Sequence, residues 1–128
     1  MPTDQRRSRG LAGERLAEQH LRDAGYRVLE RNFRTRYGEL DLIARRPEAL
    51  VFCEVKTLVA GAAAGPESPL EAIGPIKRRQ VRQMAAQWLA SRSYPERPVG
   101  ASLRFDAIGI TLSRAGEVIA LEHLENAF

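Results

Sequence analysis

The sequence of 128 residues contains a single cysteine, Cys53, so no disulfide can form within the chain. No apolar run approaches the roughly 18 residues that are needed to span a bilayer. The first ten residues are polar and rich in arginine, and they lack the apolar core of a signal peptide. We therefore expect a cytoplasmic protein without a membrane partner, in which Cys53 is a small buried hydrophobe rather than a nucleophile.

Lysine is also scarce, because 18 of the 20 basic residues are arginines. Arginine keeps its charge and prefers planar partners, whereas lysine is a compact donor whose pKa moves on burial. The choice of lysine at position 56 therefore indicates a specific role.

A net charge of +4 and a pI near 9.8 suit a polyanionic partner such as nucleic acid, although basic clusters are also common on solvated faces. Arg6, Arg7 and Arg9 give the start of the chain a basic character. Two further groups could contact phosphates: Arg31, Arg34 and Arg36, and Lys77, Arg78, Arg79 and Arg82.

Residues 38–43 and 51–56 predict a β-hairpin with three carboxylates and one lysine: Glu39, Asp41, Glu54 and Lys56. Strand residues alternate between faces, and opposed residues of an antiparallel pair share a face. A turn with an even number of residues would therefore gather the four groups within roughly 5 to 8 Å. The same face would carry Ile43, Leu50 and Phe52, and the other face would carry Leu40, Leu42, Ala44, Val51, Cys53 and Val55.

This charged group favours phosphodiester chemistry. A carboxylate pair suits Mg²⁺, and an adjacent lysine suits an attacking water or a developing oxyanion. The alternative is a cross-strand ion pair of Lys56 with Glu39 or Glu54, which would stabilise the hairpin by a few tenths to about 1 kcal/mol. Because the apolar flanks disfavour unneeded charge, the catalytic interpretation is preferred for the group as a whole.

Asp41 followed by Glu54-x-Lys56 resembles the signature of the PD-(D/E)xK, or restriction-endonuclease-like, nuclease superfamily. Leu40 stands where the signature has proline. From about residue 9 to residue 125, the chain is also similar to the YraN-like family of small bacterial proteins. That similarity rests on these motifs: Gly13-Glu14, Gly25-Tyr26, Arg31-Asn32, residues 38–43, residues 52–56 and Arg104-Phe105-Asp106. The resemblance implies a nuclease-like fold with a metal-binding active site.

The expected fold is a single α/β domain over residues 1–128, with a restriction-endonuclease-like core. Its mixed β-sheet is flanked by helices in the order αβββαββ. We expect helices at about 8–24 and 75–91. Besides the hairpin, we expect strands at about 26–33, 102–112 and 118–124. Residues 1–8 are expected to form a flexible basic arm, and residues 58–74 a flexible loop that is more weakly suggested as a lid.

The helix at 75–91 is expected to pack through one side: Ile76, Val81, Met84, Ala85 and Trp88. Lys77 falls on that side and Gln80 at its border, whereas Arg79 and Arg82 face away. In many nucleases of the superfamily a glutamine after the lysine strand assists the site, and Gln80 matches it. Met84 occupies the place of its usual aromatic companion.

Four other residues carry groups capable of chemistry. Glu14 matches an acidic helix residue that joins the metal shell in related nucleases. A salt bridge on the helix surface, with Arg15 or with the neighbours of Glu18, is an equal alternative. Asp106 is interpreted as a structural partner of an arginine rather than a peripheral site residue. His20 and His123 have no companion at metal-ligand spacing and are assigned no chemistry.

The resulting hypothesis is a metal-dependent nuclease acting on nucleic acid, DNA rather than RNA, with branched or repair-related substrates included. Asp41, Glu54 and the Val55 carbonyl would bind Mg²⁺ or Mn²⁺, and Glu14 or Glu39 would complete the shell. Lys56 would position or deprotonate the attacking water. The alternatives are a non-catalytic nucleic-acid-binding module of the same fold and a structural protein with an ion-pair network. A homodimer would suit the cleavage of two strands.

Overall fold

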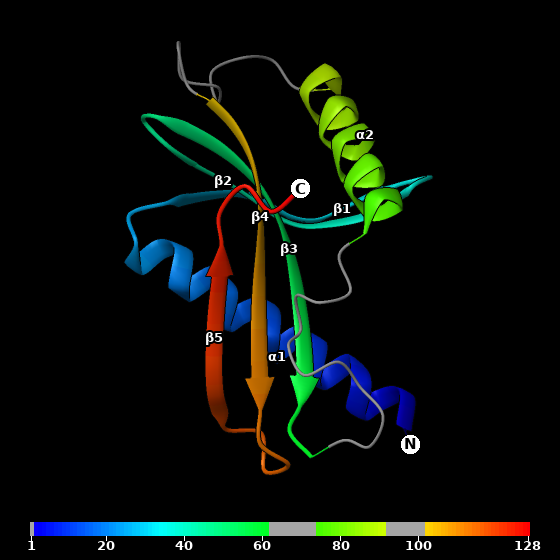
Figure 1. Ribbon diagram of the computed structural model, residues 1–128, viewed down its shortest axis with the longest axis vertical. Helices are drawn as coiled ribbons and strands as arrows, with labels where there is room; N and C mark the ends of the chain where they lie inside the picture. Colours follow the sequence, from blue (N-terminus) through cyan, green and yellow to red (C-terminus); the bar gives the residue numbers. More distant parts are fainter. Residues whose placement is uncertain (1, 62–73, 92–101) are drawn as a thin grey trace.

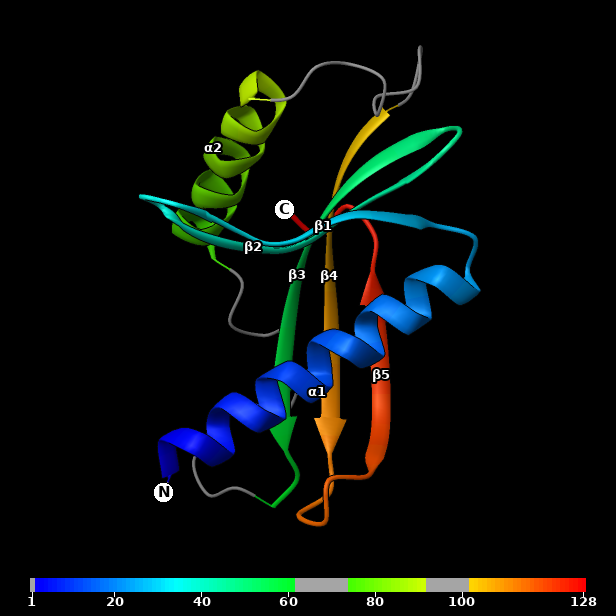
Figure 2. The same ribbon diagram turned by 180° about the vertical axis from the view of Figure 1, so that it is seen from behind.

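The computed structural model describes residues 2–61, 74–91 and 102–128, with side chains from residue 10 onward in these ranges. Helix α1 spans Pro2–Asp23 and helix α2 spans Pro75–Ser91. The strands are β1 Arg27–Thr35, β2 Gly38–Arg46, β3 Ala49–Val59, β4 Ser102–Leu112 and β5 Val118–Leu124. The helices lie on opposite faces of one sheet, α2 in front of it in Figure 1. Figure 2 shows α1 crossing the other face.

The sheet has the order β1-β2-β3-β4-β5, and only the pairing of β3 with β4 is parallel. A parallel pair needs a crossover connection, and α2 lies on it. The predicted order αβββαββ is therefore confirmed, and the architecture is consistent with a restriction-endonuclease-like core. In the described part of the chain, no helix combines the length and the apolar character that crossing a membrane requires.

The element bounds agree closely with the prediction in the second half of the chain and differ in the first. Helix α1 begins at Pro2 instead of about residue 8. Strand β3 continues past Lys56 to Val59, because residues 55–59 pair with residues 108–112 of β4. Residues 62–73 of the expected loop and the side chains of the expected N-terminal arm lie outside the described residues, so their flexibility is still a prediction.

Two apolar cores, one on each face, hold the layers together. On the α1 side, the buried residues include Ala17, Leu21, Leu42, Val51, Cys53 and Ile108. On the α2 side, they include Ile43, Leu50, Phe52, Val81, Met84 and Trp88. Cys53 is fully buried, as expected for a small hydrophobe. The prediction for Ile76 was wrong: it is 76% exposed, because the inward side of α2 begins one residue later, at Lys77.

Helix α1 approaches the sheet most closely at Gly13. A Cβ atom at this position would collide with the Thr57 side chain of β3, so only glycine allows the helix to lie this close. The next residue, Glu14, is thereby brought next to the sheet. This close contact places an acidic side chain of α1 beside the predicted site on β2.

Candidate functional site

The hairpin of β2 and β3 has the expected even-numbered turn. Arg46 pairs with Ala49, so only two residues form the turn, and the ladder continues to the pair of Leu42 with Cys53. Beyond that pair, the Val55 N–H donates to Asp41 Oδ2 at 2.7 Å. The carboxylate of Asp41 thus bonds to a main-chain group of the neighbouring strand at the point where the ladder of β2 and β3 ends.

The expected sharing of one face by all four ionisable groups was wrong. Leu40 lies in the core on the α2 side, whereas both Asp41 and Leu42 line a pocket next to α1. The alternation therefore breaks between Asp41 and Leu42. The break coincides with Asn32 on β1, which lies opposite Asp41 and has a φ of 53°, in the left-handed region.

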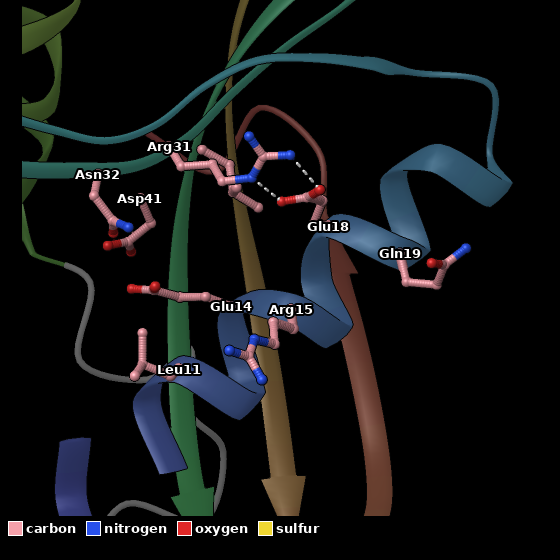
Figure 3. A pocket seen from close by; sticks show the side chains of 9 residues that line it. Leu11, Glu14, Arg15, Glu18, Gln19, Arg31, Asn32 and Asp41 are labelled. Carbon is pink, nitrogen blue, oxygen red and sulfur yellow. Dashed lines mark hydrogen bonds and ion pairs between the residues drawn. The ribbon is translucent and has the colours of Figure 1, made fainter. Parts of the chain in front are cut away.

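The consequence is an acidic cluster on the α1 side. Glu14, Glu39 and Asp41 each offer a carboxylate oxygen, and these atoms lie within 4.8 Å of one another. With its amide nitrogen turned toward the acids, Asn32 donates to Glu39 Oε1 at 2.6 Å and to Glu14 Oε2 at 3.3 Å. Figure 3 shows Glu14 reaching from α1 toward Asp41 and Asn32. Arg34 Nε lies 3.3 Å from Glu39 Oε2 and offsets part of the charge.

Glu54 approaches the same region from the α2 side. It is 3% exposed, and its Oε2 lies 3.2 Å from Lys77 Nζ. Its Oε1 is buried and has no hydrogen-bond partner among the described residues. Burial raises the pKa of Glu54, against the charges of Lys77 and Lys56, which lower it. A buried carboxylate oxygen without a donor is costly, and a cation would satisfy it.

The acids of the two sides are coupled electrostatically where β2 and β3 separate. Burial is the main reason that the pKa of Asp41 is raised from 3.8 to about 7, and the charge of Glu54 is the next. Glu14 and Glu39 raise this pKa further, whereas the hydrogen bond from Val55 lowers it. Burial and Glu39 also raise the pKa of Glu14. Like charges held this close repel one another unless protons or a cation neutralise them.

The other predicted catalytic residues border this cluster. Lys56 is half-buried on β3 and close enough to lower the pKa of Glu54. Lys77, which was predicted to contact nucleic acid, is the lysine that forms the ion pair with Glu54. Gln80 is half-buried one turn further along α2. Met84, in the place of the usual aromatic companion, belongs to the core.

The predicted phosphate-binding arginines do not form one uniform group. Arg36 donates to the Tyr37 hydroxyl at 2.7 Å and lies over its ring. Arg82 donates to the Phe128 carbonyl at 2.8 Å and lies 4.6 Å from the centre of the Phe105 ring, so it helps to hold the end of the described chain. Arg78 and Arg79 are exposed on α2.

Asp106 has the structural role that was preferred for it. It is fully buried and accepts hydrogen bonds from Arg104, from His123 Nε2 at 2.8 Å and from the Asn126 N–H at 2.9 Å. His20 Nε2 lies 2.9 Å from His123 Nδ1 and extends this network to α1.

Neither the contact between the two histidines nor the role of Asn32 was predicted from the sequence. The histidines are 103 positions apart and carry no local signal. An asparagine inside a strand was the only available signal for a left-handed residue.

Residues 13–110 match the model of a family described as "Uncharacterised protein family UPF0102". The chain belongs to the UPF0102 family. This is the YraN family that the motifs resembled.

Similar UPF0102 proteins come from several bacteria. One from Geobacter metallireducens is 42% identical over 122 residues, covering 95% of this chain and 93% of its own. One from Streptomyces griseus is 43% identical, covering 89% and 90%. One from Mycobacterium sp. (strain KMS) is 47% identical, covering 89% and 81%. UPF0102 membership therefore applies to nearly the whole chain.

Proposed function

We propose that this UPF0102 protein is a divalent-metal-dependent nuclease that hydrolyses phosphodiester bonds of nucleic acid, with DNA the preferred substrate. The observation that carries the proposal is the buried Oε1 of Glu54, which lacks a donor among the described residues. The charge of Glu54 also helps to raise the pKa of Asp41. Lys56, on the same strand as Glu54, supplies an amine at this acidic region. In ion-pair networks with only a structural role, buried carboxylate oxygens are as a rule hydrogen-bonded.

The donor set fits Mg²⁺ or Mn²⁺, because these ions prefer carboxylate and carbonyl oxygens. Asp41 and Glu54 would hold the ion together with the Val55 carbonyl. Glu14 and Glu39 would complete the shell, directly or through water, since their oxygens lie within 4.8 Å of Asp41. When bound, the cation would activate water and neutralise charge on the phosphate.

The chain's own residues would prepare the reaction. Lys56 would orient or deprotonate the attacking water and oppose the negative charge that builds on the phosphorus oxygens. Lys77 would keep Glu54 ionised despite its burial, since its charge lowers the pKa of that carboxyl group. Gln80, one turn after Lys77, would assist in placing the water.

Substrate binding would depend on phosphate contacts. The exposed Arg78 and Arg79, together with Arg34 and Arg36, would bind the backbone without reading its sequence. Affinity would then fall as salt rises. A homodimer would allow both strands of a duplex to be cut.

The test is a cleavage assay on labelled single-stranded, duplex and branched DNA and on RNA, with Mg²⁺, Mn²⁺ or chelator. Asp41→Ala, Glu54→Ala and Lys56→Ala should each abolish divalent-dependent cleavage while the circular dichroism spectrum is unchanged. Glu48→Ala is the matched control, because Glu48 is an exposed acid of the β2–β3 turn. Full cleavage by highly purified Asp41→Ala would refute the site. Salt-sensitive binding without any cleavage would instead support a non-catalytic binding module.

A further inference from the structure

A hollow of about 420 Å³ lies between α1 and strands β1 and β2, and we call it the α1 pocket. Glu14 and Asp41 belong both to its lining and to the acidic cluster. Its volume is within the range of about 300 to 1,000 Å³ that is common for sites that enclose small ligands. Whatever enters the pocket therefore lies directly beside the proposed metal ligands. If the proposed function holds, this is the place of a group next to the scissile phosphate.

The charge of the lining argues against a phosphate in the pocket. Three carboxylates face two guanidinium groups, and Glu18 already pairs with one of the latter, that of Arg31, through two hydrogen bonds. The acidic cluster can hold a cation, but the rest of the pocket disfavours an anion. A neutral part of the nucleotide is the better occupant.

The shape and chemistry of the lining suit a flat ring with a polar edge. The two bonds to Glu18 use the edge of the Arg31 guanidinium, so its planar faces are left for stacking. Leu11 adds an apolar wall and is 45% exposed. Figure 3 shows Arg31 on one side of Glu14 and Leu11 and Arg15 on the other. Unstacked bases in nucleic-acid complexes are held in this way, against arginine planes and apolar side chains.

We infer that the α1 pocket receives one unpaired nucleobase adjacent to the phosphate that is cleaved. A base within a continuous duplex would first have to be unstacked and unpaired, which costs a few kcal/mol, whereas a base that is already unpaired enters at little cost. The substrate class is therefore nucleic acid with at least one unpaired nucleotide at the cleavage position. A fully paired duplex binds only through its phosphates.

The experiment measures binding, so that it is independent of cleavage. Three labelled DNA duplexes are compared by fluorescence anisotropy with Ca²⁺, which the same oxygens can bind: one with a single bulged adenine, one with an abasic bulge, and one fully paired. The wild type should bind the adenine bulge about tenfold more tightly than the abasic bulge, as stacking of one base provides. Equal affinity for the two bulges would overturn the pocket assignment.

Two arginine variants separate stacking from charge. Arg31→Lys keeps the positive charge and a partner for Glu18, but it removes the planar guanidinium group on which a base would stack. The tenfold preference for the adenine bulge over the abasic bulge should therefore shrink to less than about twofold. Arg22→Lys is the matched control, because Arg22 also pairs with Glu18, is 51% exposed against 50% for Arg31, and does not line the pocket. It should keep the preference.

If Arg31→Lys and Arg22→Lys lose the preference for the adenine bulge to the same extent, the inference is also refuted. If Arg31→Lys does not fold, the abasic comparison on the wild type decides alone. If no nucleic acid is ever cut, only the nuclease proposal fails, whereas the preference for a bulged base still tests the pocket.

Discussion

Replacing Asp41 with asparagine separates the electrostatic cost of the acidic cluster from its structural role. Asparagine keeps an oxygen that can accept the hydrogen bond from the Val55 N–H, but it carries no charge. In the folded protein without metal, the pKa of Asp41 is raised to about 7 from a usual 3.8. Ionising this group therefore destabilises the folded state relative to the unfolded one.

The sign and the magnitude follow from this difference. Well below pH 3.8 the carboxyl group is protonated in both states, and its charge has no effect on the free energy of unfolding. Stability is lost as pH rises from there through about 7, and the full loss is at most about 4 kcal/mol. Asp41→Asn should therefore stabilise the metal-free protein at pH 8 by about 2 to 4 kcal/mol and have little effect near pH 4.

The assay is urea unfolding with chelator at several pH values between 4 and 8. Glu48→Gln serves as the control, because Glu48 lies in the exposed turn. A wild type that is as stable as Asp41→Asn at pH 8 would refute the argument. Adding Mg²⁺ should then stabilise the wild type and not the variant, because a ligand that binds only the folded state raises its stability.

Three further predictions concern the contacts around the site. Gly13→Ala should lower the free energy of unfolding by about 1 to 3 kcal/mol, because the new methyl group collides with Thr57, and Thr57→Ala in the same chain should restore part of the loss in urea titrations. Asp106→Ala should lower the free energy of unfolding by about 3 to 5 kcal/mol by leaving buried donors unpaired. Burial raises the pKa of Asp106, but its hydrogen bonds and the charge of Arg104 outweigh burial and lower it, so the contribution of Asp106 is lost only as acid protonates it below pH 3.8, which pH-dependent unfolding measures. Lys77→Met should raise the pKa of Glu54 further and move the acid limb of the pH–rate profile to higher pH.

Each of the three has an outcome that would count against it. No recovery with Thr57→Ala would mean that the cost at Gly13 is not steric. Loss of stability in Asp106→Ala that equals the loss in an exposed control, Glu117→Ala, would dismiss the buried network. An unchanged pH profile in Lys77→Met would show that the ion pair does not control the charge of Glu54.

The order of elements could be predicted from the sequence because it depends on local patterns. Alternation of polar and apolar residues located the hairpin, and the two-residue turn fixed its register. The parallel pairing of β3 with β4 follows once a long helix separates them. The bounds of α2, β4 and β5 also depend on local patterns, and the predicted bounds agree with the structure to the residue.

The arrangement of the site could be predicted only in part, because it depends on two non-local features. Asp41 lies on the α1 side, where the regular alternation breaks opposite the left-handed Asn32. The contact of Gly13 with Thr57 sets the height of α1 above the sheet, and with it the place of Glu14. The predicted acids do gather, but they approach from both faces instead of one.

The hydrogen bond from the Val55 amide to Asp41 has a consequence for reading related sequences. Asp41 completes the connection between two strands, so a relative that had lost any activity would still gain from a hydrogen-bond acceptor at this position, and an asparagine would supply it without the charge. Glu54 pairs with Lys77 through Oε2, but its Oε1 is buried without a donor in the described part of the chain, so architecture alone does not account for this carboxylate. The glutamate is therefore the better diagnostic of a working centre when homologues are sorted.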